Sequence, residues 1–206
     1  MSVWAVETAI AFLLFTIALP IAVGPMVYLH YRRFGTFRVW PALLSLGAFL
    51  YSWGLVAFTL FPLPAPDEAF CTLREDISYW QLRPFASVGE VAEAFATSGF
   101  VEALTSPVFL QVVLNVILLI PLGAYVAFRY RKGLGFTALL GLRVSLFIEL
   151  TQGTAVWGLF GCPSRLADFD DLMTNKLGAV IGWIIGSAHI AVLPDTNTKP
   201  STDIGI

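Results

Sequence analysis

The sequence predicts an all-α membrane protein: a five-helix transmembrane bundle with an extracytoplasmic loop that contains an interfacial amphipathic helix. Of its 206 residues, 57% are hydrophobic and only 13% are charged, and the mean hydropathy is +0.78. This composition is too apolar for a soluble domain of that size. Apolar runs of membrane-spanning length recur along the chain. The net charge of -2 comes with no basic face that would favour nucleic acid.

The first two apolar runs predict a pair of transmembrane helices. The first is expected over residues 8–30, with Pro20 and Pro25 kinking its second half. We expect a retained helix and not a signal peptide, because no Lys or Arg precedes the run and no small-residue cleavage site follows it. The second helix is expected over residues 39–61, which contain no charge.

A long acidic connection follows, over residues 63–107. One stretch of it has apolar residues at helical spacing while its acidic residues fall on other faces. This pattern predicts an amphipathic helix lying in the membrane interface. The apolar residues that define it are Phe85, Val88, Val91, Ala92 and Phe95.

Three further apolar runs predict the remaining transmembrane helices, over residues 108–128, 134–157 and 169–193. The polar tail, residues 194–206, is expected to be disordered and cytoplasmic. We therefore expect three parts. These are an N-terminal helix with a basic cytoplasmic loop (1–44), one transmembrane domain (45–187), and the end of the last helix with its tail (188–206).

The short basic connections predict the orientation. Five spans place both connections on one side of the membrane, and an excess of Arg and Lys marks the cytoplasmic side. The amino terminus is then outside and the carboxyl terminus inside. The basic residues concerned are Arg32, Arg33, Arg38, Arg129, Arg131 and Lys132.

The two cysteines, Cys71 and Cys162, both fall in connections that this topology places outside, on the oxidising side. We expect a disulfide between them, worth roughly 4 kcal/mol by the chain-entropy model. Two unpaired thiols are the alternative.

Polar residues recur at one depth in three of the predicted helices. At about 1.5 Å per helical residue they fall in the outer third of the bilayer. A charge in hydrocarbon costs several kcal/mol unless it is paired or hydrated, so we expect a shared cavity that opens outward. The predicted cavity residues are Asn115, Glu149, Gln152, Arg165, Asp168, Asp171, Asn175 and Lys176.

A simpler interpretation remains open, in which Glu149 pairs with Lys176 and the amides only hold helices together. Arg143 is predicted near the midplane, where a guanidinium needs a partner, and its role is left open.

Residues at the start of the last helix share one face, because they are three or four residues apart. This stripe consists of Asp168, Asp171, Asn175, Gly178 and Gly182. Asp168 and Asp170 fit a helix cap. Asp168 and Asp171, one turn apart, are also candidate ligands for a divalent metal, and Arg165 is a candidate phosphate contact. Three glycines continue the stripe at the spacing that lets another helix approach closely, within the chain or in a dimer. They are Gly178, Gly182 and Gly186.

These motifs together resemble the VanZ-like family over roughly residues 45–187. The resemblance rests on five groups of residues in matching order. They are Tyr51 to Pro62, Arg83-Pro-Phe85, Asn115 with Pro121-Leu-Gly123, Ser145 with Ile148-Glu149 and Gln152, and Arg165-x-x-Asp168-x-x-Asp171-x-x-x-Asn175-x-x-Gly178-x-x-x-Gly182. The chain departs from the family pattern at Arg83, where an aliphatic residue is more usual, in its long acidic loop, and at Arg143.

The resemblance implies a bacterial inner-membrane protein, because the founding member of the family is linked to low-level teicoplanin resistance. It implies no established reaction. It also implies that the family's polar residues fall on most of the predicted cavity.

Our leading hypothesis is a non-catalytic protein that binds an envelope amphiphile, either a membrane lipid or lipid-linked wall precursor or the lipoglycopeptide itself. No cofactor is expected, a divalent metal stays open, and the oligomeric state is not predicted.

Two other functions remain alternatives. The first is a metal-dependent enzyme acting on polyprenyl phosphates or wall precursors, with Asp168 and Asp171 holding the metal and Glu149 as general base. Against it, the outer polar set contains no His, since His30 and His189 lie elsewhere. The second is a scaffolding subunit that packs its glycine stripe against a partner.

Overall fold

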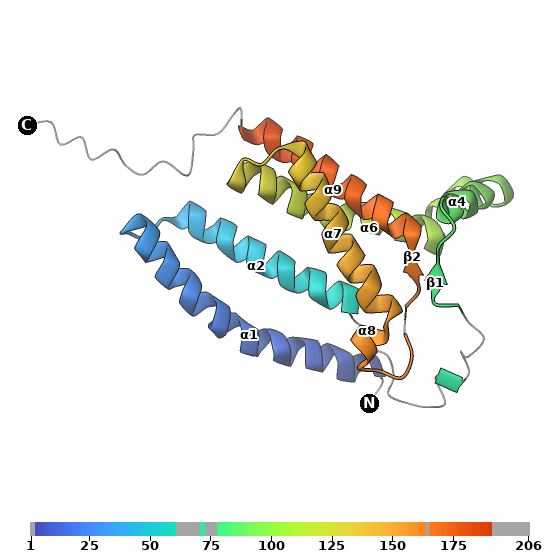
Figure 1. The fold of residues 1–206 in the computed structure, drawn as a ribbon, viewed down its shortest axis with the longest axis horizontal. Helices are drawn as coiled ribbons and strands as arrows, with labels where there is room; N and C mark the ends of the chain where they lie inside the picture. The colour runs from blue at the N-terminus through green and yellow to red at the C-terminus, as the bar shows by residue number, and fades with distance from the viewer. Residues whose placement is uncertain (1–2, 61–70, 73–77, 164, 191–206) are drawn as a thin grey trace, which may run out of the picture. The chain divides into compact units, whose positions relative to one another are not determined.

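The computed structural model describes residues 3–60, 71–72, 78–163 and 165–190 (Figure 1). The chain divides into two compact units, one formed by the first two helices within Met1–Phe61 and one within Pro62–His189. The tail predicted to be disordered, residues 194–206, lies outside the described residues. The elements of the first unit are α1 (Val3–Phe34) and α2 (Val39–Leu60). Those of the second are β1 (Trp80–Gln81), α4 (Ala86–Thr97), α5 (Phe100–Leu104), α6 (Pro107–Tyr130), α7 (Leu134–Gly153), α8 (Ala155–Gly158), β2 (Ala167–Asp168) and α9 (Phe169–Ile190).

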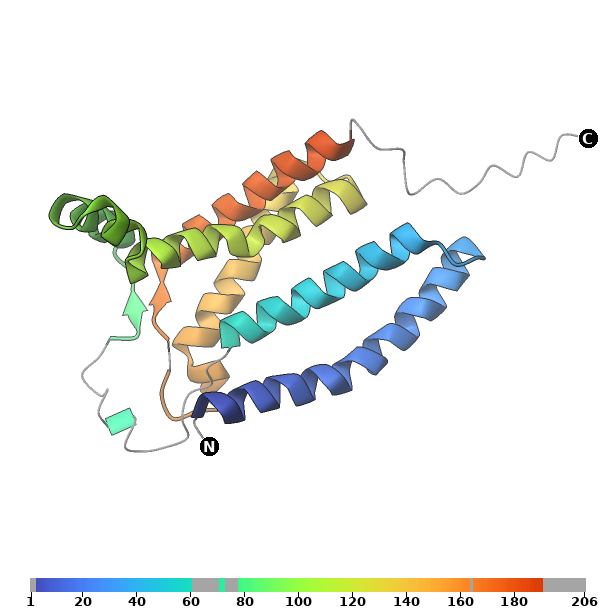
Figure 2. The ribbon, with the colours of Figure 1, turned by 180° about the vertical axis from the view of Figure 1, so that it is seen from behind.

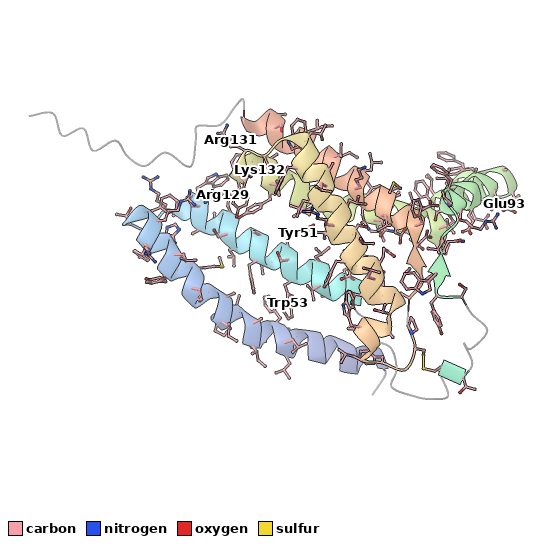
Figure 3. All side chains as sticks on the ribbon, viewed as in Figure 1. Tyr51, Trp53, Glu93, Arg129, Arg131 and Lys132 are labelled. Atoms are coloured by element: carbon pink, nitrogen blue, oxygen red, sulfur yellow. A yellow bond between two sulfur atoms is a disulfide. The ribbon has the colours of Figure 1, made fainter. Side chains whose placement is uncertain are left out.

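The first unit is a helical hairpin. The Phe15 ring on α1 contacts Phe49 and Trp53 on α2, with centroid distances of 6.3 and 5.8 Å, and Trp53 is labelled in Figure 3. α1 continues through both of its prolines as one helix, and its direction changes along its length (Figure 2). Membrane helices tolerate proline because neighbouring groups and local adjustments satisfy the freed carbonyls.

Among the described residues, four helices have the length and apolar composition to cross a membrane. The chain is therefore a mainly helical, multi-pass membrane protein. The expected fifth span, α9, is a 22-residue helix but is not among the four. The polar residues in its first two turns, from Asp170 to Lys176, lower its hydropathy. The four spans are Phe12–Phe34, Val39–Thr59, Pro107–Tyr130 and Leu134–Gly153.

The glycine stripe of α9 packs against α6 inside the chain. A Cβ atom at Gly178, Gly182 or Gly186 would overlap a backbone carbonyl oxygen of α6. From the other side, a Cβ at Gly123 of α6 would overlap the carbonyl oxygen of Ala179. Ala179 itself is fully buried. The two backbones therefore approach closely along the whole stripe, the arrangement that small residues favour.

The end of α7 differs from the sequence prediction. The helix stops at Gly153 and not near Trp157, and a short left-handed turn, α8, follows. Ala155, Val156 and Trp157 have φ angles of 53°, 55° and 59°. A Cβ on Gly153 would meet the Trp80 ring at 2.8 Å and the Ala167 Cβ at 2.9 Å. The β1 and β2 strands thus lie against the end of α7, where a longer helix would have to pass.

The all-α fold also contains a small sheet of two short strands. Strands β1 and β2 pair in parallel, with Trp80 opposite Ala167 and Gln81 opposite Asp168. Between β1 and α6 lie α4, in the segment where an amphipathic helix was expected, and α5. Exposed apolar residues mark this region, including Phe85 (72%) and Val88 (57%). That this helix lies in the membrane interface stays a prediction.

A disulfide joins Cys71 to Cys162, the pair that the topology predicts, with their Cα atoms 5.6 Å apart. The bond ties the described part of the acidic connection to the segment that leads into β2. Because it closes a loop across 91 residues, the chain-entropy model gives it about 4 to 5 kcal/mol.

Candidate functional site

A set of buried polar side chains lies where α6, α7 and the start of α9 meet. We call it the polar cluster. Its carboxylates are almost completely buried: Glu149 is 4% exposed and Asp171 is 8% exposed. Buried charged groups of this kind need hydrogen-bond partners or opposite charges. The members of the cluster are the buried residues Ser145, Glu149, Asp168, Asp170, Asp171 and Asn175, together with Asn115 of α6, whose Nδ2 atom is buried.

The Glu149 and Asp168 carboxylates accept hydrogen bonds from backbone N–H groups at the start of α9. The Asp168 backbone N–H donates to Glu149 Oε2 at 2.9 Å, so a side chain of α7 fixes strand β2. Asp168 Oδ1 accepts a hydrogen bond from the Asp170 N–H at 2.9 Å, which makes Asp168 the N-cap of α9. Its other oxygen accepts from Ser87 Oγ at 3.3 Å. Burial raises the pKa of Asp168, and the hydrogen bond from Asp170 opposes this rise.

Asp170 binds the start of another helix, α4. Its Oδ1 accepts from the Phe85 N–H at 2.7 Å and its Oδ2 from the Ser87 N–H at 2.9 Å. Phe85 has a φ of 62° and makes no side-chain cap of its own. Asp170 therefore supplies the negative charge that a helix N-terminus favours, across 85 residues of sequence. The Arg83-Pro-Phe85 motif and the acidic motif of α9 are thereby joined.

Asp171 and Asn175 connect α9 to α6 and α7. Gln111 Nε2 of α6 donates to Asp171 Oδ2 at 3.4 Å. Ser145 Oγ of α7 donates to the backbone oxygen of Asp171 at 3.3 Å and accepts from Asn175 Nδ2 at 3.0 Å. Asn115 of α6 lies beside the Asp171 carboxylate. Three helices thus meet at Asp171.

Three buried polar atoms in this region form no hydrogen bond within the described part of the chain. They are Asn115 Nδ2, Asp171 Oδ1 and Asn175 Oδ1. A buried polar atom left without a partner costs about 1 to 3 kcal/mol. They come from neighbouring positions on two helices. Asn115 Nδ2 is a donor and Asp171 Oδ1 an acceptor on side chains that interact with each other, so a bound group or water would have to compete with that contact, whereas Asn175 Oδ1 has no such neighbour among the described residues.

A more accessible rim surrounds the polar cluster. Arg165 is half-buried, and burial lowers the pKa of its guanidinium while the Asp171 and Glu149 charges raise it. The guanidinium stays charged, so it supplies positive charge beside two carboxylates. Gln152 is half-buried and Gln111 is exposed.

Lys176 does not take part in the cluster. It forms no hydrogen bond or ion pair with any residue that the structure describes. The alternative pair of Glu149 with Lys176 is therefore not formed in the structure. Glu149 has other neighbours: one of its oxygens accepts the Asp168 N–H, and its carboxylate lies near Arg165. Arg143 is exposed on α7 and also has no polar partner among the described residues.

Among the described residues, the structure adds no further His, Cys, Asp or Glu ligand to the proposed metal site. Over the described ranges, no group of three or more His, Cys, Asp or Glu side chains is arranged to hold a metal ion. Both oxygens of Asp168 already accept hydrogen bonds from the protein. Asp168 and Asp171 thus stay a two-carboxylate candidate.

Four residues form hydrogen bonds in the site but are missing from the set that the sequence predicts. They are Gln111, Ser145, Ser87 and Asp170. Gln111 and Ser145 each lie one turn before a predicted site residue, Asn115 and Glu149, so spacing four along a helix could have found them. Ser87 and the second role of Asp170 had no local signal, because their partners are more than 80 residues away.

Comparison with known proteins gives the family. The family model described as VanZ/LLP1 matches residues 48–190. That range includes every residue of the polar cluster. No curated protein and no solved structure matches the chain. Because the family match extends over well more than half of the 206 residues, the chain belongs to the VanZ/LLP1 family.

Proposed function

We propose that this protein is a non-catalytic receptor for an envelope amphiphile, a lipid-linked wall precursor or a lipoglycopeptide, and contributes to teicoplanin-type resistance. In this proposal it lies in the bacterial cytoplasmic membrane with its amino terminus outside, and the polar cluster takes the headgroup from the outer side. One observation carries the proposal: the three buried polar atoms without partners, on Asn115, Asp171 and Asn175.

The chemistry of these atoms restricts the ligand. Asp171 Oδ1 and Asn175 Oδ1 need donors, while Asn115 Nδ2 needs an acceptor. A phosphate offers only acceptors, whereas a sugar hydroxyl or a peptide amide offers both. We therefore favour a sugar or peptide part of the ligand at the cluster. Arg165 supports this assignment. Its guanidinium lies beside the polar cluster, where it could bind a phosphate or carboxylate of the same ligand molecule.

The remaining carboxylates have a structural role in the proposal. Glu149, Asp168 and Asp170 are engaged by backbone N–H groups of β2, α9 and α4. Their replacement should disturb folding before it disturbs recognition. Ligand contact is assigned to Asn115, Asp171 and Asn175, which leave hydrogen-bonding capacity unused.

The test compares variants that keep the size of the side chain. Asn115→Asp and Asn175→Asp each replace an amide, and we expect both to abolish the teicoplanin phenotype and the capture of a photoreactive lipid-linked wall precursor by the purified protein. Lys176→Gln is the matched control, since Lys176 is adjacent to Asn175 but has no polar partner among the described residues. Variants that reach the membrane at wild-type level and keep both activities would show that the cluster is not the binding site.

A further inference from the structure

A second site lies in the unit formed by α1 and α2, away from the polar cluster in the chain. A half-open cavity of about 190 Å³ lies between the two helices. Its lining is mainly apolar and includes Met26, Val27, Tyr31, Phe37, Ala42 and Leu46. Apolar cavities of about 150 Å³ stay dry and accept a guest the size of benzene. The space is therefore large enough to take part of a hydrocarbon chain.

Of the polar side chains in the cavity wall, Ser45 and His30 are already engaged, and Tyr31 adds a single hydroxyl. Ser45 Oγ donates to the Pro41 carbonyl at 2.9 Å, and His30 Nε2 accepts the Arg38 N–H at 2.9 Å. A bound water needs two to four polar partners, which this wall does not offer freely. The cavity thus favours an apolar guest over water.

Positive charge gathers at the end of the same hairpin. The guanidinium groups of Arg33 and Arg38 lie over the Phe34 ring, 5.5 and 5.3 Å from its centroid. Arg32 precedes them in the last turn of α1. His30 fixes this arrangement, because it lines the cavity and also accepts the Arg38 backbone N–H. The cavity and the three arginines, here called the arginine group, are therefore parts of one local structure.

Acidic residues are absent from the sequence around the arginine group, and the one carboxylate of α1, Glu7, lies 25 residues before Arg32. No Asp or Glu occurs between Thr8 and Pro66. An anion is attracted by such a group, most strongly near the edge of the hydrocarbon layer, where the dielectric constant is low.

We propose that the cavity and the arginine group bind one anionic phospholipid, with an acyl chain in the cavity and the phosphate at the arginines. The order along α1 fits such a lipid. Cavity residues extend from Val23 to Tyr31, about 12 Å of helix, and Arg32 and Arg33 follow directly. An apolar tail and a charged head would meet the two parts in that order. This site is independent of the proposed function, which involves the other unit.

The test is retention of lipid by the full-length protein in detergent, measured by native mass spectrometry in an equimolar mixture of phosphatidylglycerol and phosphatidylcholine. We expect one phosphatidylglycerol per chain. Each arginine near an anionic lipid contributes about fivefold in affinity, so Arg33→Gln with Arg38→Gln should weaken retention about 25-fold. The matched control is Arg129→Gln with Arg131→Gln, which removes the same charge from the other basic connection (Figure 3). Equal retention of both lipids, or equal loss in the control, would overturn the proposal.

A second measurement tests the position of the chain without relying on the stability of a variant. Phosphatidylglycerol with a photoreactive group in its acyl chain should label peptides that contain Met26, Val27 or Ala42 in the wild-type protein. Ala42→Phe, which fills the cavity, should reduce this labelling at least fivefold. Labelling confined to residues 62–189, or unchanged by Ala42→Phe in folded protein, would show that the cavity does not take the chain.

Discussion

The contact between Asp170 and the start of α4 allows one effect to be worked out in detail. In Asp170→Ala, the Ser87 N–H would lose its acceptor in a residue that is only 8% exposed, at a cost of about 1 to 3 kcal/mol. The Phe85 N–H belongs to a residue that is 72% exposed and can be rehydrated, so its lost bond contributes about 0.5 to 1.5 kcal/mol. Removing the charge from the helix N-terminus adds about 0.3 to 1 kcal/mol.

Together these losses amount to about 2 to 5 kcal/mol for the docking of α4. The suitable assay is amide hydrogen exchange of the purified protein, followed on peptides that cover residues 85–89. If this segment opens locally, exchange there should be faster by about 30-fold to more than 1,000-fold, because each 1.4 kcal/mol is a factor of ten. Asp170→Asn keeps one acceptor oxygen and should show about half of this free-energy change.

Glu93→Gln is the matched control, since Glu93 is an exposed acid on the same helix (Figure 3). It should leave exchange at residues 85–89 unchanged. Unaltered protection of this segment in Asp170→Ala, in protein that is otherwise folded, would refute the assignment of Asp170 as the anchor of α4.

Two further predictions concern packing and pH. Gly182→Ala places a methyl group against the Ile120 carbonyl and 2.8 Å from the Ala124 nitrogen. It should lower the free energy of unfolding by about 1 to 3 kcal/mol, whereas Gly135→Ala, with nothing within 4 Å, should lower neither that energy nor the melting temperature. Asp168 has a raised pKa, so its ionisation favours the unfolded chain. Its contribution to stability is present below the unfolded pKa of about 3.9 and is lost as pH rises through the folded pKa. In Asp168→Asn, the free energy of unfolding, measured by chemical denaturation between pH 4 and 7, should fall less steeply with rising pH than in the wild type. An unchanged slope would contradict the assignment of this pH dependence to Asp168.

The hydropathy of the sequence predicts the helices, and the helical spacing of small residues predicts their close packing. The run 108–128 corresponds to α6, and the four-residue spacing from Gly178 indicated a close helix contact. Depth along a helix, however, does not fix direction around it. Lys176 lies at the same depth as Asn175 but about 100° away around the axis, and it has no polar partner among the described residues.

The interactions that the sequence could not predict are those between distant segments. No local pattern shows that Asp170 will cap a helix 85 residues earlier, or that Trp80 will pair with Ala167. Asp at the second position of a helix is adequately explained by its own helix dipole. The tertiary role appears only when α4 and α9 are both in place.

The way Asp170 binds α4 has a consequence for how relatives of this protein can diverge. The carboxylate accepts hydrogen bonds from the backbone N–H groups of residues 85 and 87. A substitution at position 83 leaves these two hydrogen bonds intact, whereas position 85 must keep its N–H group and its φ of 62°. An unusual arginine at position 83 is therefore compatible with the shared framework. Because Cys71 and strand β1 anchor the connection before residue 83, chimaeras that exchange it between homologues should keep the α6, α7 and α9 framework only where both anchors are retained.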